Sequence, residues 1–210
     1  DKGAFRMGNV DGTQWNKDSI GIFSMAIGQN VKAKGIRSIA MGYGTTALGW
    51  SSTALGQSNI ASGNISTALG AETIASGTQS TAMGTNTEAT GEFSTAMGGN
   101  SIASGYVSTA IGHTTIASGY ASMALGILTT ASGERTTAMG SVTVASGDFS
   151  TSMGAGTIAS GSYSTSMGFN TKAIGANSIS MGFNTIARPY ASLVLGRYND
   201  TTSINSTSWD

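Results

Sequence analysis

Side chains that could perform catalysis are few in this sequence, and they are not grouped. His113 is the only histidine, and it directly follows Gly112. A Ser-His-Asp arrangement needs a carboxylate to orient the imidazole, but the only charged residues between residues 38 and 133 are Glu72, Glu88 and Glu92. We therefore interpret His113 as a solvated turn residue and expect no catalytic residues.

The remaining charged groups also lack the arrangement of a reactive site. Glu88 and Glu92 are four residues apart, and no third group supports them as the acid–base pair of a glycoside hydrolase. Lys32, Lys34 and Arg37 form a small basic patch, which would suit an anionic glycan, although a solvated face is the simpler interpretation. Because the chain has no cysteine, it has no thiolate nucleophile or metal ligand. We expect no metal and no cofactor.

The composition excludes several classes of protein. The 210 residues include ten basic and ten acidic side chains, whereas a nucleic-acid-binding domain needs a basic face. No run of 18 apolar residues is present, so we predict no membrane-spanning helix. We expect neither nucleic acid nor direct membrane contact for this segment.

A 14-residue repeat organises most of the chain. A pentapeptide of the form Ser-x-Ala-[Ile/Leu/Met]-Gly, defined here as positions 1 to 5, recurs thirteen times between Ser24 and Gly196 without insertion. A second motif, Ala-x-Gly, occupies positions 10 to 12, as in Ala61-Ser-Gly63, and its last copy reads Ala187-Arg-Pro189. Most of the 31 glycines fall at these two sites, so they act as periodic punctuation.

This period favours stacked β-strands over helices. Two glycines in every repeat would destabilise a helix by about 2 kcal/mol per repeat. Two short strands separated by glycine turns fit 14 residues better. We predict strands at positions 1–5 and 8–12, stacked into an all-β parallel β-solenoid. Twelve steps of the strand spacing of about 4.8 Å would make a rod roughly 58 Å long.

Repetition turns each position into a ladder of side chains along the rod. Position 3 is alanine from Ala26 to Ala138, and position 4 is always large and apolar. Adjacent residues of a strand face opposite sides; the spacing allows either ladder to line the interior, and we favour the small residues inside. The exposed stripe would be larger than monomers tolerate, so we predict a homo-oligomer with cyclic symmetry. Its interface would contain Ile27, Met41, Leu55, Leu69, Met83, Met97, Ile111, Leu125, Met139, Met153, Met167, Met181 and Leu195.

Positions 8 and 9 are less uniform. Position 9 is mostly Ile or Val but includes Lys32, Glu88 and Lys172. A buried ladder does not accept unpaired charges, so we expect position 9 to be half-exposed. Position 8 is mostly threonine, from Thr45 to Thr185. This row either reflects the strand propensity of threonine or forms a regular ice-binding surface.

The two ends differ from the middle. Residues 1–23 carry two apolar clusters, Ala4-Phe5 and Ile20-Gly-Ile-Phe23, and we predict that they form a cap over the first coil. Residues 24–196 would form the roll of thirteen repeats. Residues 197–210 would form an exit segment towards a neck or stalk.

Aromatic residues gather at positions 6, 13 and 14, beside the expected turns. Rings on a rigid edge suit contact with a sugar or a protein, and they can also serve to cover neighbouring turns. The candidate ligand-contact residues are Trp50, Tyr106, Tyr120, Tyr163, Phe169 and Phe183.

The Ser-x-Ala-[Ile/Leu/Met]-Gly motif, followed by Ala-Ser-Gly at this period, resembles the head repeats of YadA-like trimeric autotransporter adhesins over about residues 24–196. The resemblance implies a left-handed parallel β-roll, a homotrimer and a surface-exposed adhesive head. Similar repeats occur in phage-like tail fibres. The family motif linked to matrix binding is only approximated, for example by Asn177-Ser-Ile-Ser-Met-Gly182, so we do not carry collagen binding over.

We therefore expect a non-enzymatic surface adhesin head that attaches to a host or matrix protein, a surface glycan or another cell. The resemblance implies an extracellular location on a bacterium, with an outer-membrane anchor beyond this sequence. The alternatives are a shaft or receptor-binding segment of a phage or contractile-injection tail fibre, and a rigid spacer.

Overall fold

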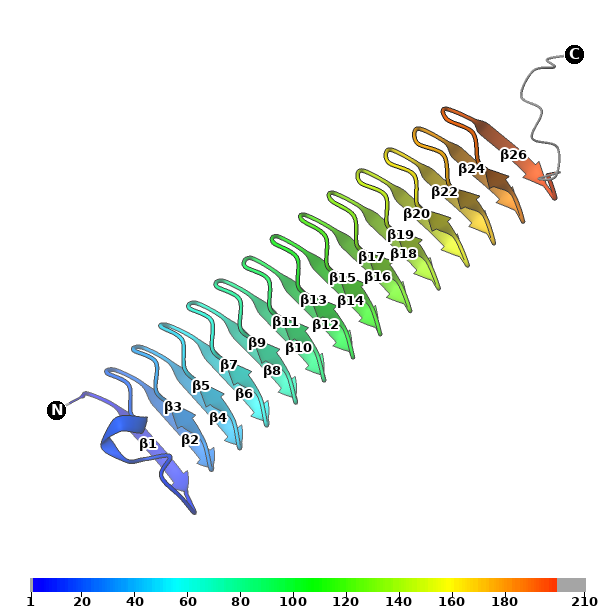
Figure 1. Ribbon diagram of the computed structural model, residues 1–210. Helices are drawn as coiled ribbons and strands as arrows, with labels where there is room; N and C mark the ends of the chain where they lie inside the picture. The colour runs from blue at the N-terminus through cyan, green and yellow to red at the C-terminus, as the bar shows by residue number, and fades with distance from the viewer. Residues whose placement is uncertain (1, 200–210) are drawn as a thin grey trace, which may run out of the picture.

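Stacked coils of the chain build a rod with the N-terminal segment at one end and the last strand at the other (Figure 1). The structure, a computed structural model, describes residues 2–199. Each coil passes through one long strand and one short strand, and equivalent strands of successive coils pair in parallel at an offset of 14 residues. The predicted all-β parallel solenoid is confirmed.

Two parallel sheets run the length of the rod. The large sheet contains 14 five-residue strands: β1 (Phe5–Asn9), β2 (Met25–Gln29), β4 (Ile39–Tyr43), β6 (Thr53–Gln57), β8 (Thr67–Ala71), β10 (Thr81–Thr85), β12 (Thr95–Gly99), β14 (Thr109–His113), β16 (Met123–Ile127), β18 (Thr137–Ser141), β20 (Thr151–Ala155), β22 (Thr165–Phe169), β24 (Ile179–Phe183) and β26 (Leu193–Arg197). The small sheet contains 12 two-residue strands: β3 (Lys32–Ala33), β5 (Thr46–Ala47), β7 (Ile60–Ala61), β9 (Ile74–Ala75), β11 (Glu88–Ala89), β13 (Ile102–Ala103), β15 (Ile116–Ala117), β17 (Thr130–Ala131), β19 (Val144–Ala145), β21 (Ile158–Ala159), β23 (Lys172–Ala173) and β25 (Ile186–Ala187).

The strands occupy positions 2–6 and 9–10, so the predicted limits of 1–5 and 8–12 are wrong in detail. The short strand ends early because the backbone N–H groups of Ser104 and Gly105 both donate to the carbonyl of Ala117, at 2.9 and 3.2 Å. Two donors on one acceptor bend the chain away from the extended course. The glycine at position 5 lies inside a strand instead of in a turn.

The turns depend on residues at positions 7 and 14, most of which are not glycine. These residues adopt the left-handed conformation, with φ of 53° at Asn86 and 57° at Phe93, which costs energy for ordinary side chains. Hydrogen bonds between coils hold them there: the N–H of Asn86 donates to Ala71 O and that of Phe93 to Thr78 O, both at 2.9 Å. The prediction of glycine turns is therefore incorrect.

The repeated glycines are needed because successive coils approach closely. A Cβ atom on Gly98 would collide with the carbonyl oxygen of Gly112 in the next coil, and the φ of Gly98 is +108°. Gly105 has no positive φ, but a Cβ there would collide with the backbone of Gly119. Both sites therefore exclude a side chain through backbone contact between coils.

Small residues fill the narrow space between the sheets. The alanines of positions 3 and 10 are fully buried, which confirms that the small ladder faces inward. Serine at position 1 closes the turn before it; Ser52 Oγ, for example, donates to Gly49 O at 2.8 Å. The threonines of position 8 are also fully buried. The ice-binding interpretation of this row is therefore wrong.

The N-terminal segment contains a strand of the large sheet. β1 pairs with β2 in register, with Gly8 opposite Gly28, so the cap predicted for residues 1–23 continues the solenoid. The 3₁₀ helix η1 (Lys17–Ser19) lies in the connection between them, and Lys2 Nζ donates to the carbonyl of Lys17 at 2.6 Å. Arg6 takes the place of a position-3 alanine. Burial lowers the pKa of its guanidinium, whose two terminal nitrogens have no hydrogen-bond partner among residues 2–199.

At the other end, Asn199 closes the small sheet. Its Oδ1 accepts a hydrogen bond from the Ile186 N–H at 2.6 Å, and its Nδ2 donates to the Ile186 carbonyl at 2.9 Å. This side chain satisfies backbone groups that another strand would otherwise pair with, which protects an exposed sheet edge. Most of the exit segment predicted for residues 197–210 lies outside the described residues.

Candidate interaction surfaces

The outer face of the large sheet, called here the large-sheet face, carries the position-4 ladder. Met83, Met97 and Ile111 are direct neighbours on adjacent strands, and the ladder contains no charged residue from Ile27 to Leu195. The ladder residues are half-buried or exposed in the single chain, with Ile111 38% exposed. The structure therefore places all thirteen predicted interface residues on one uninterrupted apolar stripe.

The outer face of the small sheet, the small-sheet face, is mixed. Position 9 combines residues such as Ile116, which is 37% exposed, with Lys32, Glu88 and Lys172. As predicted, most of these side chains are half-buried or exposed. This face does not need a partner, because its charges are solvated and its apolar residues are interrupted.

One turn edge carries a continuous row of rings, called here the aromatic edge: Phe93, Tyr106, Tyr120, Arg135, Phe149 and Tyr163. The Tyr106 and Tyr120 rings stack with centroids 5.3 Å apart, and the Phe149 and Tyr163 rings with centroids 4.8 Å apart. Phe93 meets Tyr106 edge-on at 5.5 Å. Arg135 connects the two halves, with its Cζ 5.5 Å from the Tyr120 ring and 5.2 Å from the Phe149 ring.

Stacking decides what the aromatic edge can offer to a ligand. Consecutive rings cover one another's faces, so a sugar ring cannot lie flat on an inner ring of the row. The outward rims and the tyrosine hydroxyl groups stay exposed; Tyr163 is 60% exposed. The rings thus cover neighbouring turns and also present a ridge suited to lateral contact with another surface.

The six predicted contact residues do not form one site. Tyr106, Tyr120 and Tyr163 belong to the aromatic edge, and Trp50 lies alone on that same side of the coils, at position 13. Phe169 and Phe183 stack at 5.1 Å on the opposite edge, which is formed by positions 6 and 7. Arg135 was not predicted, although a position-14 arginine between two aromatic coils is a signal that the sequence contains.

The residues considered for catalysis stay apart. The only hydrogen bond of His113 within residues 2–199 joins its Nδ1 to Thr114 Oγ1 at 3.1 Å, while Glu88 lies on the small-sheet face. In the same part of the chain, no three His, Asp or Glu side chains gather where they could hold a metal ion. Lys32 lies on the small-sheet face and Arg37 in the following turn. Among the described residues, no helix is long and apolar enough to cross a bilayer.

Comparison with known families identifies the repeat. The family model described as the YadA head domain repeat, which holds two copies of the repeat, matches residues 19–45, 33–53, 47–73, 75–101, 103–129, 131–157 and 159–185. No curated protein matches the chain. Such head repeats are typical of surface-exposed adhesins of the trimeric autotransporter type. These matches cover most of the chain and coincide with its coils, so the chain belongs to the YadA head domain repeat family.

Proposed function

We propose that this chain is the non-enzymatic head of a homotrimeric adhesin on a bacterial surface, and that it attaches to a host or matrix protein, a surface glycan or another cell. The observation that carries the proposal is the contrast between its surfaces. The large-sheet face offers one apolar stripe to sister chains, while the turn edges carry the chemically varied side chains.

Assembly through the large-sheet face follows from the energy of apolar exposure. Burying a large apolar side chain contributes about 1.5–3 kcal/mol, and thirteen of them lie in one line on each chain. Three chains that turn this face towards a common axis would cover the stripes. The turn edges would then stay at the outside of the trimer.

Adhesion is assigned to the aromatic edge. A rigid ridge of rings has little side-chain entropy to lose on contact, and each trimer would present it three times. Repetition turns weak contacts into useful avidity when the target is itself multivalent. The absence of grouped reactive side chains within residues 2–199 supports a role without catalysis.

The test is a paired substitution of Tyr106→Ala with Tyr120→Ala. We expect lower adhesion to cells or matrix in a plate assay and a melting temperature within a few degrees of the original. Tyr190→Ala is the matched control, since Tyr190 occupies position 13 on the same edge and makes no ring contact within residues 2–199. We expect this control to adhere normally.

The rigid spacer is the second candidate, and the covered ring faces favour it. If the paired variant loses stability together with adhesion, the rings are structural covers. If both quantities are unchanged, the aromatic edge is not the adhesive surface.

A further inference from the structure

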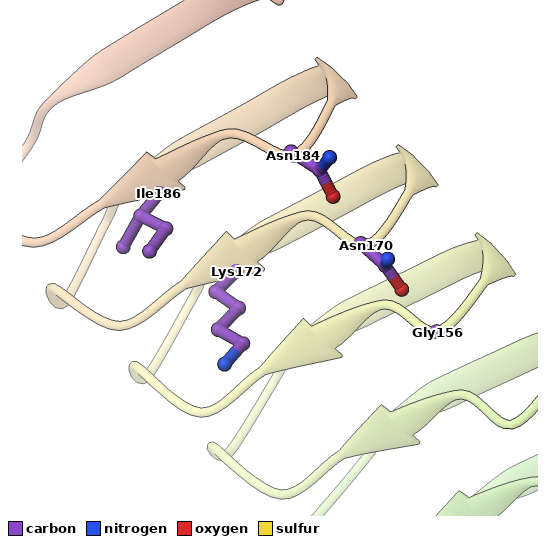
Figure 2. A pocket seen from close by; sticks show the side chains of 5 residues that line it. All are labelled: Gly156, Asn170, Lys172, Asn184 and Ile186. Carbon is purple, nitrogen blue, oxygen red and sulfur yellow. The ribbon is translucent and has the colours of Figure 1, made fainter. Parts of the chain in front are cut away.

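A hollow on the opposite edge brings a lysine ammonium close to two side-chain amides (Figure 2). The hollow has a volume of about 310 Å³ and is lined by Gly156, Asn170, Lys172, Asn184 and Ile186. Gly156, Asn170 and Asn184 occupy position 7 of three successive coils, and Lys172 and Ile186 occupy position 9. The coil geometry therefore places all five on one side of the rod.

Gly156 creates the hollow because it has no side chain. A Cβ atom at this residue would collide with Asn170 Oδ1, so the amide oxygen of Asn170 lies over the glycine. Elsewhere the same place is filled: Asn86 Nδ2 donates to Asn100 Oδ1 at 2.7 Å. In Figure 2 the Lys172 side chain extends towards the preceding coil, which carries Gly156.

The polar groups of the hollow are available to a ligand. The side chains of Asn170, Lys172 and Asn184 make no hydrogen bond or ion pair within residues 2–199. Lysine supplies up to three donors, and an amide supplies donors and an acceptor. The hollow therefore offers one positive charge with paired donor and acceptor groups, and no acidic residue lines it.

The first coil shows what such an amide recognises. Asn30-Val-Lys32 has the same form and repeat position as Asn170-Thr-Lys172. Asn30 Oδ1 accepts a hydrogen bond from the backbone N–H of Asp11, and Asn30 Nδ2 donates to Asp11 Oδ2, both at 3.0 Å. A position-7 asparagine thus binds an aspartyl residue at two points, through its N–H and its carboxylate.

We propose that the hollow binds an aspartyl residue of a partner protein. Asn170 takes its N–H and carboxylate as Asn30 takes those of Asp11, and Lys172 adds a charge-assisted hydrogen bond to the carboxylate. This contact lies on the edge opposite the aromatic edge and does not depend on adhesion through the rings.

The test uses the whole chain and short blocked peptides, measured by isothermal titration or saturation-transfer NMR. Acetyl-Gly-Asp-Gly-amide should bind, and the matched Asn peptide should bind at least tenfold more weakly because it lacks the charge. Lys172→Gln should weaken binding of the Asp peptide about tenfold. Lys32→Gln, the equivalent lysine beside an amide that Asp11 already occupies, should leave it unchanged.

A second pair of variants separates the hollow from general surface charge. Gly156→Asn should abolish binding without lowering the melting temperature, because asparagine already occupies this left-handed position in other coils. Gly44→Asn is its control: Gly44 is also a position-7 glycine, and a Cβ there would meet only Ser58 Oγ at 3.7 Å. The control should bind normally.

Three results would overturn the proposal. Equal binding of the Asp and Asn peptides would remove the carboxylate, and equal losses in Lys172→Gln and Lys32→Gln would remove the site. Tighter binding of glucuronate than of the Asp peptide would assign the hollow to an acidic sugar in place of a protein. The Tyr106→Ala and Tyr120→Ala pair should leave peptide binding intact, which separates this test from the test of adhesion.

Discussion

Positions 1–7 and 8–14 of each coil follow related backbone courses but carry different outer faces. Each half has a hydroxyl residue first, alanine third, glycine fifth and a left-handed residue seventh in most coils. Outside, the first half presents an unbroken apolar ladder, whereas the second tolerates Lys32, Glu88 and Lys172 at position 9. Close packing between coils therefore constrains the shared residues, and the outer faces are free to differ.

This contrast indicates that solvent does not explain the large-sheet face. Ile111 and Ile116 belong to one coil and have nearly equal exposure, 38% and 37%, in the single chain. If both faces met water, charged residues would be equally acceptable on each. Their exclusion from the position-4 ladder across thirteen coils is typical of a buried interface.

Exchanging the two halves should have the largest effect. Deleting residues 101–107 places the second half of every later coil on the large sheet, so that Ser118 and Ser132 continue the line of Met97. We expect loss of assembly and a melting temperature lower by more than ten degrees. Deleting residues 94–107 removes a whole coil and should only shorten the rod by about 4.8 Å. Circular dichroism and light scattering compare the two deletions, and similar results for both would refute the register.

A matched charge on each face should have the next largest effect. Ile111→Glu would put three carboxylates near one axis of a trimer, at a cost of several kcal/mol each if they stay ionised. We expect the scattering mass to fall from about three times the chain mass of 21.0 kDa towards one. Ile116→Glu should keep the full mass, because Glu88 already occupies position 9. Equal behaviour of the two variants would show that the large-sheet face is solvated.

The interior offers a smaller test of how the halves cooperate. In the last three coils with serine at position 3, that serine pairs with the threonine of position 8, as Ser166 does with Thr171 at 2.7 Å. In coils with alanine there, Thr87 and Thr143 have no partner for Oγ1 within the described chain. Ser166→Ala should therefore lower the free energy of unfolding by about 1 kcal/mol.

The reverse substitution checks the same pair. Ala138→Ser would give Thr143 the partner that it lacks and should raise the free energy of unfolding by about 0.5–1 kcal/mol. Denaturant titration of both variants measures the two changes. Equal destabilisation by both would mean that the interior is limited by volume instead of by hydrogen bonding.

Much of the solenoid follows from the repeat alone. A period of 14 with two glycines favours stacked strands, and neither β1 nor Arg135 required more than a closer reading of Arg6-Met-Gly8 and of the aromatic coils. The αL turns were missed because residues such as Ile65 and Val107 adopt φ of 58° and 54°. Only the hydrogen bonds of neighbouring coils hold β-branched residues there, and local propensity does not include them.

The sequence by itself determined the period, the parallel stacking and the existence of two apolar ladders on opposite sides of a strand. Only the tertiary structure decided that alanine faces inward, because alternation along a strand assigns sides but not the distance between sheets. It also decided which rings stack and where Gly156 leaves Lys172 and Asn170 beside a hollow. These features depend on contacts between coils 14 residues apart, where side-chain conformation and the close approach of backbones act together.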